Sequence, residues 1–309
     1  MMKPLAQSTP EGTTRVDATA GAFYAQNGYR VLRGLIRAEA ITAVHNVLAH
    51  EVYANSAPLK RHLSLTKDPH AYVATADGRT TVANALLDPH MQTETPTLRR
   101  ALIDLICTTA VADGLASIDD ARAYVVRQII LFFVSPGTDT HIDGWGGDTV
   151  PPGGQITLWI PLEPVTPENG PVGIFPWPKG QLLSDKDLGI DINRGTPDEI
   201  YNRYHDALKV AIRERGIMCT VPQLDVGDLL AFSSLTPHMS LPPRREGLTR
   251  MALQVLIRPL RSPWHRSIPQ ALAGDVRYRQ PYCAKIGTRW RVPHSAATST
   301  FKWLWQSIR

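Results

Sequence analysis

The feature that most constrains the fold is a series of short, strand-like segments between residues 122 and 260. Residues 124–134, 157–165, 228–234 and 249–257 are rich in β-branched, aromatic and aliphatic side chains, and glycine- and proline-rich stretches separate them. In the last segment apolar residues alternate with polar ones, which gives one apolar and one polar face. Several short strands of this kind predict a β-sandwich or a β-barrel.

Helical patterns occur before the strands and once between them. The stretch that ends in QNGY predicts a short helix that stops at Gly28, because glycine favours the left-handed conformation that ends helices. Residues 38–52 and 97–115 carry apolar side chains at spacings of three and four, which predicts two further helices. Residues 196–199 (TPDE) form a capping-box pattern that begins a helix, and Gly216 ends it. We expect these helices to pack outside the strands.

The chain is expected to form one domain with two extensions. Residues 1–17 are polar and predict a disordered N-terminal tail. Residues 18–260 predict a single domain, in which a helical prelude (18–120) precedes the strand-rich core (122–260). Residues 261–309 are basic and contain four of the seven tryptophans. We expect this C-terminal extension to pack on the same domain.

Composition indicates an ordinary globular protein, with 43% hydrophobic and 20% charged residues. The longest purely aliphatic and aromatic run, residues 129–134, is far too short to span a bilayer. The net charge of +5 is not concentrated in a Lys/Arg run, so we expect a solvated basic surface and neither a nucleic-acid nor a membrane partner. The three cysteines lack CxxC spacing and the N-terminus lacks an apolar signal, so we expect a cytoplasmic protein.

A His-x-Asp pair carries the candidate chemistry. In an extended segment, His141 and Asp143 point to the same side. Two imidazoles and one carboxylate occupy one face of an octahedral iron(II) site and leave three positions open, as the facial triad of non-haem iron oxygenases requires. A third ligand would have to come from a distant strand. The pair alone also fits an ordinary surface histidine followed by a turn aspartate.

Five segments in the same order extend the pattern beyond the pair, and together they resemble the phytanoyl-CoA dioxygenase superfamily. The resemblance runs from about residue 20 to residue 260. The segments are FYAQNGYRVLRGLIRAEAITAVHNVL, HID, TLWIPLEPVTPENGP, LDVGDLLAFSSLTPHMS and an arginine, Arg250, twelve residues past His238.

The resemblance implies a double-stranded β-helix, or jelly roll, which binds iron(II) and uses 2-oxoglutarate and dioxygen. It implies that His141, Asp143 and His238 hold the metal. It also implies that Arg250 pairs with the far carboxylate of 2-oxoglutarate, and arginine suits that role because its planar fork matches a carboxylate. Ser240 could assist there. Arg245, in the same connection, is the main rival to Arg250.

Three further residues are candidates for contact with the co-substrate. Strand alternation lets only one of Arg127 and Gln128 face the barrel interior, and we assign that place to Gln128. Thr157 and Trp159 share one face of their strand, and either could reach the site. Each of these residues is also compatible with simple packing.

The substrate pocket is predicted near Trp145, Trp177 and Lys179, because these residues flank the expected mouth of the barrel. Large aromatic side chains serve equally well as packing, and a lysine is more often a solvated surface charge. The chain departs from the family pattern at residues 175–180 (FPWPKG), where a Pro-Gly-Ser-His-like stretch is common. The pocket wall there is therefore expected to be reshaped.

The leading hypothesis is an iron(II)- and 2-oxoglutarate-dependent dioxygenase of secondary metabolism that hydroxylates a C–H bond of a small organic molecule. Desaturation, epimerisation or cyclisation by the same centre are alternatives. Halogenation is disfavoured because Asp143 fills the position that a halide needs. A non-catalytic jelly-roll binding protein is the rival from another class, and a zinc hydrolase is weaker because the HExxH spacing is absent. We expect a monomer or a homodimer.

Overall fold

The computed structural model describes residues 18–53, 59–63, 65–265 and 283–294. Within them, the main sheet has nine strands, seven of which follow one another in the order β1-β10-β8-β12-β6-β15-β14. Their bounds are Tyr29–Leu32 (β1), Leu229–Ser233 (β10), Ile156–Pro161 (β8), Ala252–Pro259 (β12), Tyr124–Phe132 (β6), Trp290–Pro293 (β15) and Cys283–Ile286 (β14). The remaining two strands are β5 (Ala85–Leu87), which pairs with β6, and β2 (Arg61–His62), which pairs with β5.

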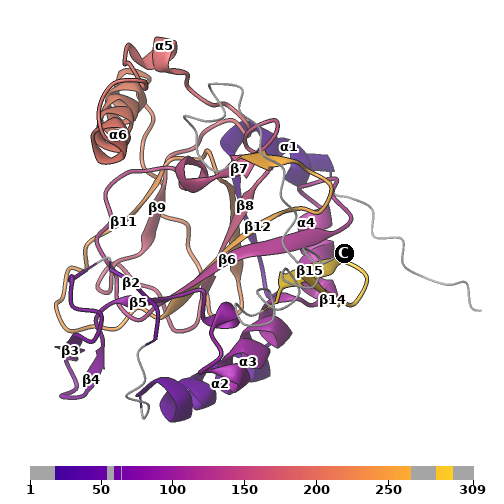
Figure 1. Ribbon diagram of the computed structural model, residues 1–309, viewed down its shortest axis with the longest axis vertical. Coiled ribbons are helices and arrows are strands. Elements are labelled where there is room, and N and C mark those ends of the chain that lie inside the picture. Colours follow the sequence, from indigo (N-terminus) through magenta and orange to yellow (C-terminus); the bar gives the residue numbers. More distant parts are fainter. Residues whose placement is uncertain (1–17, 54–58, 64, 266–282, 295–309) are drawn as a thin grey trace, which may run out of the picture.

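A short second sheet completes the barrel. It consists of β9 (Val172–Ile174) and β11 (His238–Ser240), and an antiparallel bridge joins His141 to the β11 residue His238. Figure 1 shows β9 and β11 beside the longer strands β8, β12 and β6. The core is therefore a double-stranded β-helix, as predicted. Two small strand pairs lie outside it: β7 (Asp148–Thr149) with β13 (Trp264–His265), and β3 (Tyr72–Ala74) with β4 (Thr80–Val82).

Strand alternation separates two apolar layers. On β10, Leu229 and Ala231 join the largest hydrophobic cluster, which also contains the buried residues of the helical prelude. Leu230 and Phe232, one position away on the same strand, pack on the other side with Trp159. The predicted alternation on β12 is confirmed in the same way, because Leu253, Val255 and Ile257 join the cluster of the helical layer, as does Met251 just before the strand.

Two pairs of helices lie at opposite ends of the barrel. Figure 1 shows α2 and α3 together at one end, and α5 and α6 at the other. Their bounds are Ala18–Asn27 (α1), Ala38–Val47 (α2), Pro96–Ile106 (α3), Thr109–Ala116 (α4), Asp185–Leu188 (α5) and Pro197–Glu214 (α6). The structure confirms that Thr196 begins α6. It also confirms that α1 ends at Gly28 and α6 at Gly216. Residues 48–53 continue α2 as a π-helix.

The single helix predicted over 97–115 is wrong. The chain leaves helical geometry at Cys107 and starts α4 anew, because the Thr108 hydroxyl accepts a hydrogen bond from the Val111 amide as a helix N-cap. A continuous apolar stripe does not distinguish one helix from two helices that pack on the same surface.

Part of the C-terminal region joins the main sheet, because β15 pairs in parallel with β6. Its residue Trp290 is buried, packs against Tyr124 with ring centroids 5.7 Å apart, and donates from Nε1 to the Thr108 carbonyl. Trp303 and Trp305, like the tail 1–17, lie outside the described residues. The division into one domain with two extensions stays a prediction.

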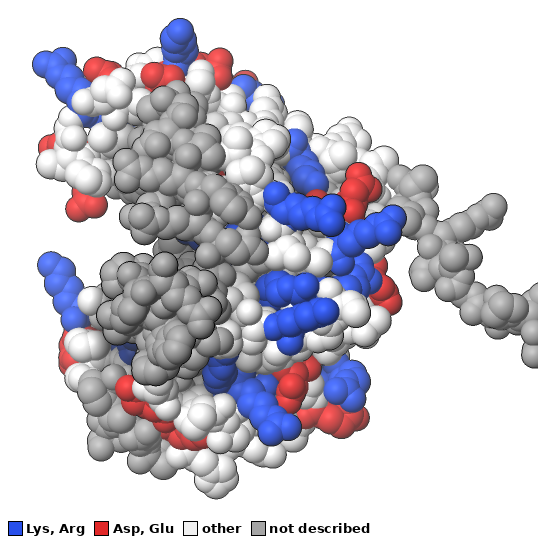
Figure 2. Space-filling view, turned by 45° about the vertical axis from the view of Figure 1, so that its right-hand side comes forward, with Lys and Arg blue, Asp and Glu red and all other residues white. Residues whose placement is uncertain are grey.

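Charged side chains of both signs are mixed on the face shown in Figure 2, where acidic groups stand among the lysines and arginines. Arg289 with Asp113 and Arg33 with Asp228 are examples of ion pairs between segments distant in sequence. No helix among the described residues is long and apolar enough to cross a membrane.

Trp290→Ala is expected to lower the free energy of unfolding by about 3–5 kcal/mol, because it removes a fully buried ring from the packed core. Denaturant unfolding would measure the change. Met218→Ala is the control: Met218 is 80% exposed, and its replacement should change stability by less than about 0.5 kcal/mol. Equal stabilities of the two variants would show that β15 is not part of the cooperative core.

Candidate active site

A cavity of about 380 Å³ opens between the main sheet and the short sheet. Strands β6, β8 and β12 supply one wall, and β9, β11 and α6 supply others. The predicted site residues that line it are His141, Asp143, His238, Arg250, Ser240, Gln128, Trp159 and Trp145. The fold therefore brings most of the predicted site together.

The His-Asp-His group has the spacing of a metal site. The Asp143 Oδ1 atom lies 3.8 Å from His141 Nε2 and 3.6 Å from His238 Nε2. Two ligand atoms that each lie about 2.1 Å from one ion can be at most about 4.2 Å apart, so one ion could contact all three side chains. These three residues are the only such group of three or more found in the described part of the chain.

Both histidine rings are held in the tautomer that a metal needs. His141 Nδ1 lies 2.8 Å from the Asp139 carbonyl, and His238 Nδ1 lies 3.1 Å from the Thr236 carbonyl. A carbonyl oxygen only accepts, so each Nδ1 donates and each Nε2 keeps its lone pair. Burial lowers the pKa of His238 to about 4, and its Nε2 has no hydrogen-bond partner although it is buried. The donor set thus fits a divalent metal.

Two neighbouring side chains orient the carboxylate of Asp143. The Thr157 hydroxyl donates to Oδ2 over 2.6 Å, and the Gln254 amide donates to both oxygens over 3.1 and 3.2 Å. Thr157 therefore reaches the site through Asp143, and it does not line the cavity. Gln254 was not among the predicted site residues, although its alternation with Arg250 on one strand face could have identified it.

Arg250 lies at the other end of the cavity, where it is 2% exposed. Its Nη2 donates to Ser240 Oγ over 3.1 Å, and its Nε is buried without a partner. The guanidinium lies 5.3 Å from the ring centre of Trp159 and 5.6 Å from that of Phe132. Burial lowers the pKa of Arg250 to about 10, so it remains charged at neutral pH. A buried cation is stable only with an acceptor, so this end of the cavity fits a carboxylate.

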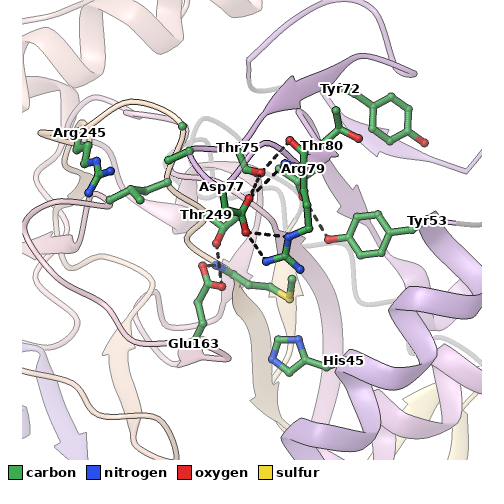
Figure 3. Close-up of a pocket in the computed structure, with 15 residues that line it drawn as sticks. His45, Tyr53, Tyr72, Thr75, Asp77, Arg79, Thr80, Glu163, Arg245 and Thr249 are labelled. Atoms are coloured by element: carbon green, nitrogen blue, oxygen red, sulfur yellow. Dashed lines mark hydrogen bonds and ion pairs between the residues drawn. The ribbon is translucent and has the colours of Figure 1, made fainter.

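A second, larger hollow of about 780 Å³ lies outside the barrel, and Figure 3 shows its lining. Arg245 lines this hollow and not the cavity of the triad. Glu163, also in its wall, accepts hydrogen bonds from the Thr249 hydroxyl and the Met251 amide, the two neighbours of Arg250 in sequence. The chain thus turns Arg250 inward and leaves Arg245 outside, which favours Arg250 over its rival.

The assumption that only one of Arg127 and Gln128 can face the interior is wrong. Both line the cavity. Leu256 pairs with Gln128 while the next residue, Ile257, pairs with Val126, so Arg127 is the extra residue of a β-bulge. A bulge breaks the period of two and lets neighbouring side chains point to the same side.

Trp177 and Lys179 do not line the cavity, and their prediction as substrate contacts is not supported. Backbone hydrogen bonds from Trp177 to Asn27 and from Lys179 to Ala25 hold their segment against α1, on the outside of the barrel. Trp177 is buried in a hydrophobic cluster with α6, and Lys179 forms an ion pair with Asp119. Gly28 allows the close approach, because a Cβ there would lie 2.2 Å from the Trp177 carbonyl oxygen.

Helix α6 contributes contacts that the sequence patterns did not predict. Tyr201, His205 and Lys209 lie one turn apart and all meet the segment around the first metal motif. Tyr201 packs edge-on against Trp145 and lines the cavity, His205 Nε2 accepts the Ile142 amide over 3.4 Å, and Lys209 pairs with Asp139. The i, i+4, i+8 spacing shows that these three residues share one face of the helix, but the sequence does not show which segment packs against that face.

A jelly roll with two histidines, one aspartate and a buried arginine around one cavity defines a non-haem iron, 2-oxoglutarate-dependent oxygenase. The family model for phytanoyl-CoA dioxygenase (PhyH) matches residues 24–252, more than half of the chain. The chain belongs to the phytanoyl-CoA dioxygenase family, and the resemblance seen in its sequence is confirmed.

Solved structures share the fold. EctD from S. alaskensis with bound Fe has a TM-score of 0.57 at 16% identity, covering 93% of this chain and 91% of that one. The 2-oxoglutarate-dependent carbocyclase SnoK from nogalamycin biosynthesis has a TM-score of 0.55 at 15% identity, covering 90% and 98%. The epimerase SnoN from the same biosynthesis has a TM-score of 0.51 at 16% identity, covering 90% and 95%. None of the curated proteins compared matches the chain.

His205 is expected to make the protein less stable in acid. Burial lowers its pKa from 6.5 to about 4, so the unfolded chain binds the proton more readily than the folded one. The contribution of His205 is fully present above pH 6.5 and is lost as the pH falls toward 4. At about pH 5 this loss is about 2 kcal/mol.

Denaturant unfolding at about pH 7.5 and about pH 5 tests this expectation. His205→Gln should reduce the difference in stability between the two conditions, whereas His70→Gln, at an exposed histidine, should keep it. A full wild-type difference in His205→Gln would show that another group causes the acid sensitivity.

Proposed function

We propose that the protein oxidises, and most simply hydroxylates, a C–H bond of a small organic molecule. The observation that supports the proposal is that one cavity contains both the three candidate iron ligands and the buried, incompletely paired Arg250. A triad alone would suit several metal sites, but the additional buried cation specifies a carboxylate ligand within reach of the metal.

Each residue has a separate part in this proposal. His141, Asp143 and His238 hold iron(II), and Thr157 and Gln254 orient the Asp143 carboxylate. Iron(II) and 2-oxoglutarate, bound at these residues, would supply the oxidising chemistry, in which dioxygen oxidises the substrate and converts 2-oxoglutarate to succinate and carbon dioxide. Arg250 binds the far carboxylate of 2-oxoglutarate. Ser240, Trp159 and Gln128 line the part of the cavity that 2-oxoglutarate occupies.

The substrate occupies the side of the cavity next to Trp145 and Tyr201. The wall of the cavity as a whole also contains apolar residues such as Ile130, Met239 and Leu256. Asp143 is the only carboxylate among the lining residues of the described chain, so the wall offers a cationic substrate no carboxylate besides this candidate metal ligand. Desaturation, epimerisation and cyclisation remain the alternatives, because they differ only in where the substrate sits.

We further propose a cytoplasmic location and a monomer or homodimer that acts on a small molecule. Cys107 and Cys219 form no disulfide, which suits a reducing compartment.

The experiment that tests the function is anaerobic addition of iron(II) and then 2-oxoglutarate, followed by absorption spectroscopy. The wild type should bind one iron and develop a weak visible metal-to-ligand band. His141→Ala, Asp143→Ala and His238→Ala should each weaken iron binding by more than the about 10–100-fold that is typical for loss of a hydrogen-bond partner of a ligand, because each removes a ligand itself. His45→Ala, at a histidine outside the cavity, is the control. A triad variant that binds iron normally would not have lost a ligand, and a wild type without the band would contradict the proposed class.

Arg250→Leu should raise the dissociation constant of 2-oxoglutarate by a factor that corresponds to about 3–5 kcal/mol, because it removes the buried partner of a carboxylate. Iron binding should survive, since no metal ligand changes. Arg250→Lys should recover only part of the affinity, because a point charge cannot reproduce the planar fork. The same titration measures all three variants. Arg245→Leu is the matched control, and a loss in Arg245→Leu without a loss in Arg250→Leu would reverse the assignment.

A further inference from the structure

The β-bulge in β6 has a specific consequence for the cavity. It inserts Arg127 beside Gln128 and turns the guanidinium toward the segment that follows Asp143. Bulges next to active sites commonly redirect one side chain in this way. The side chain is largely buried, and burial lowers the pKa of Arg127 although Asp148 and Asp143 oppose this effect. Such a cation needs fixed acceptors.

The acceptors of Arg127 are provided by the protein itself. Its Nη1 donates to the Gly147 carbonyl over 3.0 Å and to Gln155 Oε1 over 2.8 Å, and its Nη2 donates to the Gly146 carbonyl. Trp264, in the strand that pairs with β7, lies over the guanidinium at 5.8 Å. Arg127 thus joins a bulged barrel strand to two consecutive carbonyls of one turn.

That turn connects the metal motif with the cavity wall. Residues Asp143–Gly146 form a 3-10 turn, in which Trp145 lines the cavity beside Tyr201. Gly147 then has a φ of 132°, a conformation that suits glycine alone and points its carbonyl at Arg127. Thr157 and Gln254 hold the Asp143 carboxylate independently of this contact.

We propose that Arg127 is a positioning residue, which fixes residues 144–147 and thereby the Trp145 side of the substrate cavity. It acts by donating hydrogen bonds to the Gly146 and Gly147 carbonyls, and not as a ligand of iron, of 2-oxoglutarate or of the substrate. This proposal depends on the proposed function in one respect, which is that the cavity is the substrate site. The contact itself is independent of which reaction occurs there.

Hydrogen exchange of the amides in residues 144–149 tests the proposal. The full chain is compared with Arg127→Met and Arg127→Lys, both metal-free and after anaerobic loading with iron(II) and 2-oxoglutarate. Arg127→Met should accelerate exchange in this segment by about tenfold or more, because the turn loses the hydrogen bonds to its Gly146 and Gly147 carbonyls. Arg127→Lys should fall between the wild type and Arg127→Met, since its compact ammonium lacks the planar fork in which Nη1 and Nη2 each donate to a different carbonyl. The dissociation constant of 2-oxoglutarate, read from the visible band, should change by less than about threefold, because Arg250 is untouched.

The matched control is Arg289→Met. Arg289 also donates to two backbone carbonyls, those of Arg122 and Ala112, and pairs with Asp113, but it lies away from the cavity. Its replacement should lower the melting temperature without accelerating exchange in residues 144–149. If Arg127→Met does not fold, Arg127→Lys carries the same comparison.

Three results would overturn the proposal. Exchange in residues 144–149 could remain at the wild-type rate in the Arg127 variants, or it could rise equally in Arg289→Met, which would reflect general destabilisation. The affinity for 2-oxoglutarate could instead fall by about tenfold or more in Arg127→Met, which would make Arg127 a co-substrate ligand. Failure of the proposed function would appear separately, as a wild type that forms no iron–2-oxoglutarate band, while exchange of the metal-free chain would still report on Arg127.

Discussion

The site depends on one pair of backbone hydrogen bonds between segments far apart in the chain. The His141 amide donates to the His238 carbonyl over 2.9 Å, and the His238 amide donates to the His141 carbonyl over 3.0 Å. This reciprocal pairing extends the short sheet by one residue and places the two imidazoles with centroids 4.3 Å apart. Asp143 then joins them, because the extended residue Ile142 separates it from His141 and the 3-10 turn begins at Asp143 itself.

Around this pairing, the barrel buries several charged side chains, and each has a different set of hydrogen-bond partners. Asp148 is buried, which raises its pKa, and it accepts hydrogen bonds from three backbone amides and from the Ser234 hydroxyl. Arg127 donates to the Gly146 and Gly147 carbonyls. Asp148 and Arg127 therefore both hold the loop after the metal motif against the barrel. Arg250 is different, because its buried Nε has no acceptor from the protein. Buried polar groups are normally paired, so the group without a partner indicates where a ligand binds.

Sequence patterns succeeded where periodicity was unbroken. Arg250 and Gln254 lie on the polar face that the alternation within residues 249–257 predicts, and both line the cavity. The same reasoning failed at Arg127, because a bulge changes the register without a clear sequence signal. A different argument, from position near the expected mouth of the barrel, failed at Trp177, whose side chain is packed against α6. Composition and spacing do not show which way a loop residue turns.

The sequence by itself determined the class of fold, the main strand-forming segments of the core and the identity of the triad candidates. Those features are carried by local periodicity and by short motifs that stand in a fixed order. Only the tertiary structure decided which neighbours complete the site: Gln254 and Thr157 on the carboxylate, Tyr201 in the wall, and Arg127 on the turn after Asp143. The physical reason is that these contacts join strands and a helix that are distant in sequence. Their geometry depends on register, bulges and packing, which are properties of the assembled barrel and not of any single segment.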